Sequence, residues 1–239
     1  MTKQGAASKT FVLVHGAWRG GWIWRRVADL LTANGHKVFT STLSGVADRS
    51  HILSRDIDLS THITDVVNLM KWEDLRDVAL CGHSYAGMVV SGVAEKTEGA
   101  ISSIVFLDAF TPENGQSLFD LITPERREGT LELIEMGALT QDPISAAAFG
   151  VNEKMRAWVD SKCTPHPIRC FMEKVALTGA RERIAKKTYV FASGWESHFR
   201  PFYEKKKADP SWRTYDLPCG HDVMVDMPDR LAEILEEAA

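Results

Sequence analysis

The chain lacks the sequence features of several large classes of protein. Its apolar stretches fall short of the roughly 18 residues that a membrane-spanning helix needs, and the polar residues 1–9 do not resemble a secretion signal. The Gly-x-Gly-x-x-Gly and Gly-Lys-Ser/Thr patterns of nucleotide-binding loops are absent, as is the His-Glu-x-x-His metal motif. We therefore expect no membrane association, no cofactor and no metal.

Disulfide-type cysteine spacing and an excess of basic charge are also missing. The four cysteines form no Cys-x-x-Cys pair, which favours a reducing cytoplasm over a disulfide framework. The chain has 28 Lys and Arg against 32 Asp and Glu, a net charge of −4, so nucleic acid is not an expected partner. The sequence leaves the oligomeric state open, a homodimer included.

Apolar runs rich in β-branched residues alternate with segments of helical periodicity. With 239 residues and 44% hydrophobic content, the chain fits a single α/β domain over 1–239. The alternation predicts a mostly parallel sheet with helices on both faces. The expected strands are 10–14, 36–41, 77–81, 101–107, 187–192 and 212–217. The expected helices are 22–31, 60–70 with Ser60 as N-cap, 87–96, 199–208 and 228–237.

Residues 111–185 break this alternation. Five prolines interrupt them, and only short patches at 131–134, 153–159 and 171–177 have helical spacing. We expect this segment to lie above the sheet as an inserted helical lid and to decide substrate choice.

A candidate nucleophile lies at the turn between the strand 77–81 and the helix 87–96. Residues 82–86 read Gly-His-Ser-Tyr-Ala, and a serine between small residues at such a turn is the pattern of a nucleophile elbow. Bulkier side chains two positions from Ser84 would collide with the neighbouring strand and helix. An ordinary strand-to-helix junction remains the alternative.

Acyl transfer requires further groups near Ser84. A hydroxyl is a weak nucleophile until a base takes its proton, and His221, in a glycine-containing loop after the last strand, is the candidate base. A structural histidine is the alternative there. The backbone N–H groups of Tyr85 and Ala17, in the loop after the first strand, are the expected oxyanion donors.

The order of these motifs resembles the α/β-hydrolase superfamily. They are His-Gly-Ala-Trp at 15–18, Gly-His-Ser-Tyr-Ala-Gly at 82–87 and Gly-His at 220–221. The chain is similar to the small esterases that include plant methyl-ester hydrolases and hydroxynitrile lyases. Residues 107–118, Leu-Asp-Ala-Phe-x-Pro-Glu-x-Gly-Gln-Ser-Leu, resemble bacterial relatives, some of which cleave esters or carbamates of aromatic compounds. The resemblance covers nearly the whole chain and implies an α/β-hydrolase fold.

Two residues could orient the imidazole of His221. In many members of this superfamily the acid follows the strand that corresponds to 187–192, where Glu196 is in range. Asp108 instead ends the strand 101–107 and should emerge at the carboxyl edge of the sheet, one strand from Ser84. We favour Asp108, with a turn-capping role as its alternative.

Trp18 and Arg19 are the candidate pocket residues. Arg19 should overhang the oxyanion site and favour substrates with a carboxylate or electron-rich carbonyl, although a solvated arginine fits the pattern as well. Trp22 and Trp24 are expected in the core, and His62 on a helix face.

These residues predict a cofactor-independent serine hydrolase acting on a small carboxylic ester, or a carbamate or amide, through an acyl-enzyme on Ser84. A hydroxynitrile lyase, a non-hydrolytic receptor and a cofactor-free oxygenase are the alternatives on this fold. The lyases that this chain resembles carry threonine where Gly16 stands, and lysine where this chain has Asp222.

Overall fold

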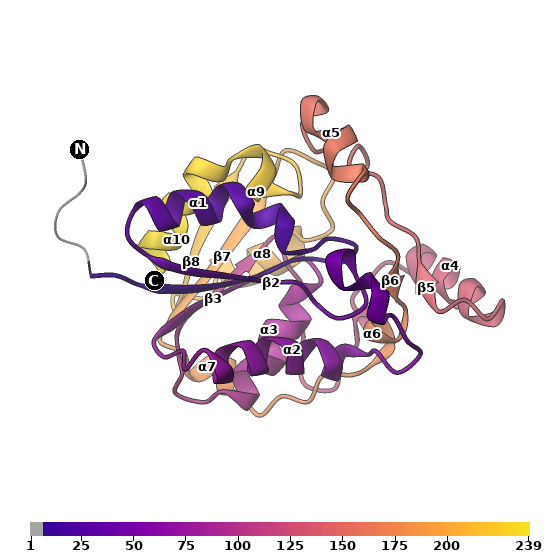
Figure 1. The fold of residues 1–239 in the computed structure, drawn as a ribbon, viewed down its shortest axis with the longest axis horizontal. Helices are drawn as coiled ribbons and strands as arrows, with labels where there is room; N and C mark the ends of the chain where they lie inside the picture. The colour runs from indigo at the N-terminus through magenta and orange to yellow at the C-terminus, as the bar shows by residue number, and fades with distance from the viewer. Residues whose placement is uncertain (1–6) are drawn as a thin grey trace.

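One six-stranded parallel sheet forms the centre of the computed structural model, which describes residues 7–239 (Figure 1). The strand order is β2-β1-β3-β4-β7-β8. Every residue of β3 is buried, because β3 lies between two strands and under helices on both faces, whereas the edge strand β2 is partly exposed. The strands are β1 (Thr10–Val14), β2 (Lys37–Ser41), β3 (Val78–His83), β4 (Ile101–Leu107), β7 (Lys186–Ala192) and β8 (Trp212–Leu217).

Helices cover both faces of the sheet, as the alternation predicts. One face carries α1 (Arg25–Ala33), α9 (Val223–Asp226) and α10 (Pro228–Ala238), and the other carries α2 (Leu59–Trp72), α3 (Ala86–Lys96) and α7 (Ala180–Arg183) (Figure 1). Helix α8 (Arg200–Lys207) packs on β7 and β8. Three 3-10 helices, η1 (Gly21–Trp24), η2 (Ala47–Ile52) and η3 (Leu118–Asp120), lie in the connections.

The strand register brings three chain segments to one edge of the sheet. Val14 of β1 pairs with Gly82 of β3, and His83 of β3 pairs with Leu107 of β4. Parallel strands in this register release the residues that follow them at the same carboxyl edge. The segments after β1, β3 and β4 therefore emerge side by side.

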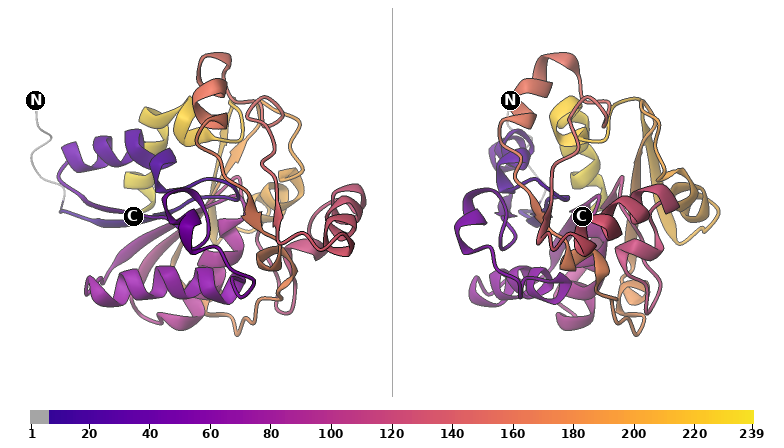
Figure 2. Two further views of the ribbon diagram at one scale, coloured as in Figure 1. Left: turned by 45° about the vertical axis from the view of Figure 1, so that its right-hand side comes forward. Right: turned by 90° about the vertical axis from the view of Figure 1, so that its right-hand side faces the viewer.

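Most of residues 111–185 lie beyond this carboxyl edge, with α4 projecting from the body of the molecule (Figure 2). The end of the segment runs back along the face of the sheet, where Thr178 and Ala180 contact Glu95 of α3 and α7 packs on α3. The expected helix over 171–177 is wrong, because α6 ends at Met172. The backbone of Val175 pairs instead with Gly115 and Gln116 at 2.9 Å each. Besides η3 and α7, the elements of the segment are α4 (Pro124–Glu135), β5 (Thr140–Gln141), α5 (Glu153–Asp160), β6 (His166–Pro167) and α6 (Arg169–Met172), with β5 and β6 paired antiparallel.

The N-terminal end of α2 differs from the sequence prediction. Asp58, not Ser60, is the N-cap, and its carboxylate accepts the Thr61 amide in a capping box. Ser60 donates through its amide and hydroxyl to Glu173 at 2.8 and 2.5 Å, which ties α2 to the segment 111–185. Across residues 7–239, no helix has the length and apolar character needed to cross a membrane.

Candidate active site

Ser84 lies at the sharp turn between β3 and α3. Its φ of 55° is in the left-handed region, an unfavourable conformation for a serine that the surrounding hydrogen bonds maintain. The Ser84 amide donates to the Leu107 carbonyl at 3.1 Å, and the Ser84 carbonyl accepts the amides of Gly87 and Phe110 at 3.0 and 3.2 Å. A Cβ at Gly82 would lie 2.7 Å from the Ala86 oxygen, so this turn requires glycine there.

His221 contacts Asp108 and lines the same cavity as Ser84. The His221 Nδ1 lies 2.7 Å from an Asp108 carboxylate oxygen, and both side chains are buried. Asp108 also accepts the Trp195 indole N–H at 3.1 Å and the Ala192 amide at 3.3 Å. This geometry places the Nδ1 proton toward Asp108 and leaves Nε2 as the free proton acceptor. Glu196 lies exposed and outside this arrangement.

Burial decides the charge state of the imidazole. It lowers the pKa of His221 to about 3, so the ring is neutral near pH 7 and can accept a proton. Burial also raises the pKa of Asp108, while the Ala192 amide and the Trp195 indole stabilise its charged form. The 2.7 Å contact joins the two groups, so the protonation of one affects the other.

Two backbone amides face the same space as Ser84. Ala17 and Tyr85 both line the cavity at Ser84, and among the described residues neither N–H has an acceptor. Tyr85 immediately precedes α3, whose N-terminal dipole favours negative charge at this position. The loop that carries Ala17 approaches Ser84 closely, because a Cβ at Gly16 would lie 2.8 Å from the Ser84 Cβ.

An aromatic-rich cavity of about 550 Å³, partly open to solvent, lies over these groups. Trp18 lines it, as the sequence predicts, and its Nε1 donates to the Gln141 carbonyl at 3.0 Å. The lining residues are Ala17, Trp18, Ser84, Tyr85, Phe110, Leu118, Ile122, Arg126, Thr130, Gln141, Ile144, Phe149, Phe171, His198, Phe199 and His221.

Arg19 does not lie at the pocket mouth, so that prediction is wrong. The side chain is only 1% exposed and forms an ion pair with Asp222 at 2.9 Å behind His221. It also donates to the Cys163 sulfur at 2.8 Å. Burial disfavours the charge on Asp222, but Arg19 outweighs it and lowers the pKa of that carboxyl. Arg19 therefore joins the loop of Ala17, the loop of His221 and the segment 111–185.

His62 lies on a helix face, as the sequence predicts, and this is the buried face of α2. One ring nitrogen lies 3.0 Å from the Tyr85 hydroxyl and the other 2.9 Å from the Ser44 carbonyl. His62, His166 and Cys170 bring one nitrogen or sulfur atom each within 4.8 Å of one another. The Trp18 amide donates to His166 Nδ1, which places the His166 proton on Nε2. That tautomer opposes binding of a metal by His166 Nε2.

Sequence reasoning missed the aromatic residues that enclose His221. Phe199 stacks on the imidazole with ring centroids 5.2 Å apart, and Phe149 and Trp195 lie at 4.9 and 5.0 Å. The Phe149 carbonyl also accepts the His221 amide at 2.9 Å. Trp195 lies shortly after the end of β7, next to Glu196. Its place near that strand end is the one sequence signal that could have indicated its contact with His221.

Comparison with known proteins agrees with this architecture. The chain matches the alpha/beta hydrolase family over residues 11–234. A carbendazim hydrolyzing esterase of Nocardioides sp. (strain SG-4G) is 42% identical over 235 residues, covering 94% of this chain and 97% of that protein. Salicylic acid-binding protein 2 of Nicotiana tabacum is 36% identical over 107 residues, covering 44% of this chain and 41% of that protein.

A solved structure extends the likeness to the whole fold. An extracellular alpha/beta-hydrolase from a Paenibacillus species superimposes with a TM-score of 0.85 at 24% identity, covering 97% of this chain and 99% of that one. The family match and the full-length bacterial relative support hydrolase activity of the esterase type. The chain belongs to the alpha/beta hydrolase family.

Proposed function

We propose that the chain is a serine hydrolase that cleaves a small ester or carbamate bearing an aromatic group, through an acyl-enzyme on Ser84. The observation that carries this proposal is the shared cavity. Ser84, the base His221 and two amides without acceptors all border it, and His221 contacts Asp108 at 2.7 Å. Nucleophile, base, orienting acid and oxyanion donors are the set that acyl transfer needs.

In the first half of the reaction, the Ser84 oxygen attacks the substrate carbonyl carbon while His221 Nε2 takes the hydroxyl proton. The amides of Ala17 and Tyr85 stabilise the negative charge that develops on the carbonyl oxygen. His221 then gives its proton to the departing alcohol, and the acyl group remains on Ser84. Asp108 keeps the imidazole in the required tautomer and stabilises its charged form.

In the second half, a water molecule attacks the acyl carbon and His221 takes its proton. Collapse of the second intermediate releases the acid and returns the proton from His221 to Ser84. A carbamate follows the same steps, and its product acid then loses carbon dioxide.

Hydrolysis is favoured over a lyase reaction by two features near His221. A threonine side chain at Gly16 would meet the Ser84 Cβ, which lies 2.8 Å from the Cβ position. The residue after His221 is the acidic Asp222, and its charge is already paired with Arg19. No cation is therefore offered at that position to a departing anion such as cyanide.

The aromatic wall supports aromatic substrates. Six aromatic rings of the lining belong to Trp18, Tyr85, Phe110, Phe149, Phe171 and Phe199. The relative at 42% identity is named for carbendazim hydrolysis, which makes carbendazim a reasonable first compound to assay. We assign selection among such substrates to the segment 111–185, acting as a lid.

Replacement of Ser84 tests the proposal. Ser84→Ala should remain folded and lower kcat toward p-nitrophenyl acetate, or toward whichever panel ester the wild type cleaves, by about 10⁴-fold or more. Intact mass after a serine-directed fluorophosphonate should show one adduct in the wild type and none in the variant. Ser193→Ala, in the turn after β7 and away from the cavity lining, is the matched control and should label normally. Near wild-type turnover by pure Ser84→Ala protein would rule out the mechanism.

A further inference from the structure

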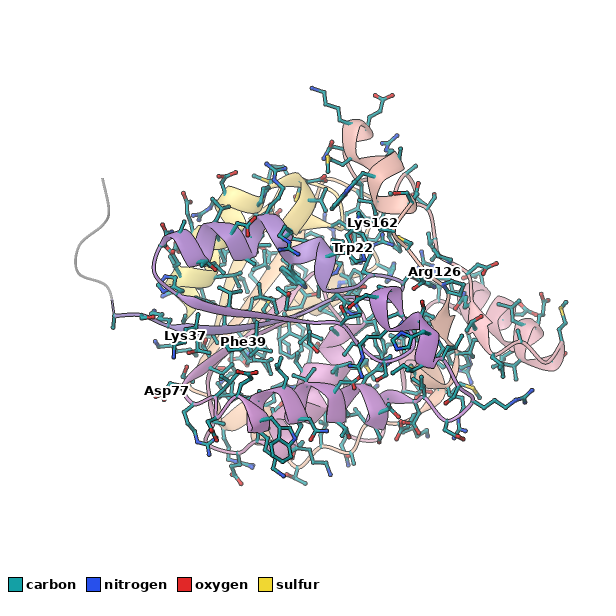
Figure 3. The ribbon with its side chains drawn as sticks, viewed as in Figure 1. Trp22, Lys37, Phe39, Asp77, Arg126 and Lys162 are labelled. Carbon is teal, nitrogen blue, oxygen red and sulfur yellow. The ribbon has the colours of Figure 1, made fainter. Side chains whose placement is uncertain are left out.

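The cavity contains one cation whose charge the protein does not balance. Arg126 lies in the first turn of α4, where this helix meets the body of the molecule (Figure 3). Its side chain is partly buried, and no residue between 7 and 239 makes an ion pair or a hydrogen bond with its guanidinium. Burial lowers the pKa of Arg126. A partly buried charge without a partner costs free energy, so the presence of Arg126 at this position requires an explanation.

The two fully buried arginines show how the chain balances such charges. Arg19 pairs with Asp222, and Arg181 contacts Glu182, the Ser91 hydroxyl and the Pro112 carbonyl. Arg126 differs from both, because the space in front of it is the cavity at Ser84 and not a protein carboxylate.

No side chain of the cavity lining supplies negative charge. The lining contains no aspartate and no glutamate, and its two histidines are neutral near pH 7, since burial lowers the pKa of His198 to about 4 and that of His221 to about 3. The positive charge of Arg126 contributes further to both decreases. The N-terminal dipole of α4 adds to the positive potential, because Arg126 lies within its first turn.

We propose that Arg126 recognises a carboxylate on the substrate, remote from the bond that is cleaved. The inference rests on the proposed function, since it assigns the substrate class of that same cavity. The planar guanidinium can hold a carboxylate through two parallel hydrogen bonds, and the aromatic wall holds the ring between that carboxylate and the scissile carbonyl. The preferred substrate is then an aromatic ester that also carries one free acid group.

Matched pairs of neutral and anionic compounds test this recognition in the full-length enzyme. On the acyl side, monomethyl terephthalate is compared with methyl 4-carbamoylbenzoate. On the leaving-group side, 4-acetoxybenzoic acid is compared with 4-acetoxybenzamide. In at least one pair, the wild type should prefer the acid by about tenfold or more in kcat/KM, which is the scale of one charge-assisted interaction.

Substitutions on α4 identify the residue responsible. Arg126→Gln should bring the ratio of kcat/KM between the acid and its amide partner to about one, mainly by raising KM for the acid. Arg126→Lys should keep part of the preference for the acid, because it retains the charge without the planar fork. Arg127→Gln is the matched control, since Arg127 is the exposed neighbour on the same helix, and it should behave as the wild type.

Binding to the Ser84→Ala variant separates this inference from the proposed reaction. Calorimetry on that variant should give a lower Kd for the acid than for the amide, and the difference should vanish in the Ser84→Ala/Arg126→Gln double variant. This result would stand even if no ester were hydrolysed. Equal affinity for acid and amide, no measurable binding of either acid, or an acid preference that survives Arg126→Gln would overturn the inference.

Discussion

The two walls of the cavity are built in different ways. The wall at the sheet edge carries Ser84, Asp108 and His221 on turns that follow paired strands, and each has backbone hydrogen bonds that fix it. The opposite wall comes from residues 111–185, where the only strands are two residues long and α4 projects outward (Figure 2). In the proposed reaction the chemical groups therefore sit on a rigid scaffold, and we assign selectivity to a segment that can vary without changing the sheet.

The largest expected effect on the sheet-edge wall comes from Asp108. Asp108→Asn should lower kcat by about 10³- to 10⁴-fold, because the amide no longer holds His221 in the tautomer with Nε2 free. Steady-state kinetics on an activated ester measures the loss. Glu196→Gln is the control and should change kcat little, since Glu196 is exposed. If the two losses were reversed, Glu196 would be the orienting acid.

The next effect concerns Arg19, which joins the two walls. Arg19→Met leaves Asp222 buried without a partner, so the free energy of unfolding should fall by about 3–5 kcal/mol in urea denaturation. The double variant Arg19→Met/Asp222→Leu removes both charges and should recover most of that loss. A double variant as unstable as Arg19→Met alone would mean that packing, not unpaired charge, is responsible.

On the opposite wall the expected effect is smaller and depends on the substrate. Ile122→Ala enlarges the cavity and should change the ratio of kcat/KM between a small and a bulkier aryl ester by about tenfold. The kcat for the better substrate should stay within a few-fold of wild type, because the part of the substrate near Ile122 is remote from the bond that is cleaved. Equal losses for every ester would mean that this wall also holds the catalytic groups in place.

The smallest effect is a shift in the pH profile. Imidazole must be neutral to act as base, and burial lowers the pKa of His221 to about 3. The acid limb of kcat/KM should therefore lie below the ordinary imidazole value of about 6.5. Phe199→Ala exposes the ring to water and should move the limb upward. An acid limb at 6.5 in the wild type, unmoved by Phe199→Ala, would contradict this account of burial.

Sequence reasoning could place the residues of the sheet-edge wall for a physical reason. Strands of a parallel sheet reveal themselves as apolar runs, and their ends mark which residues share an edge. That rule, the elbow motif around Ser84 and the resemblance of residues 107–118 together point to Ser84, Asp108 and His221, and the rule alone leaves Glu196 as an alternative to Asp108. The backbone of Tyr85 and Ala17 follows from the same edge, because both residues lie in the short segments that follow β3 and β1.

The same reasoning failed where contacts join residues that no periodicity connects. No residue near Arg19 in the sequence indicates that its side chain is buried in an ion pair. Its partner Asp222 lies 203 residues away. Arg126 lies on a helix with little amphipathic character, so the pattern does not reveal that one face of its first turn borders a cavity. The Ser60 cap failed for a similar reason, because the hydroxyl of Ser60 bonds to distant Glu173.

The hydrogen bond between the Phe149 carbonyl and the His221 amide bears on how this enzyme can diversify. Residues 111–185 belong to a single connection between the adjacent strands β4 and β7, so one contiguous stretch of gene could be exchanged while the strand order is kept. Residues 111–185 also supply the Phe149 carbonyl that accepts the backbone amide of His221, and the Cys163 sulfur that Arg19 contacts. A transplanted segment must rebuild both contacts, so new substrate ranges are gained most readily by changes that spare the backbone around Phe149 and Cys163.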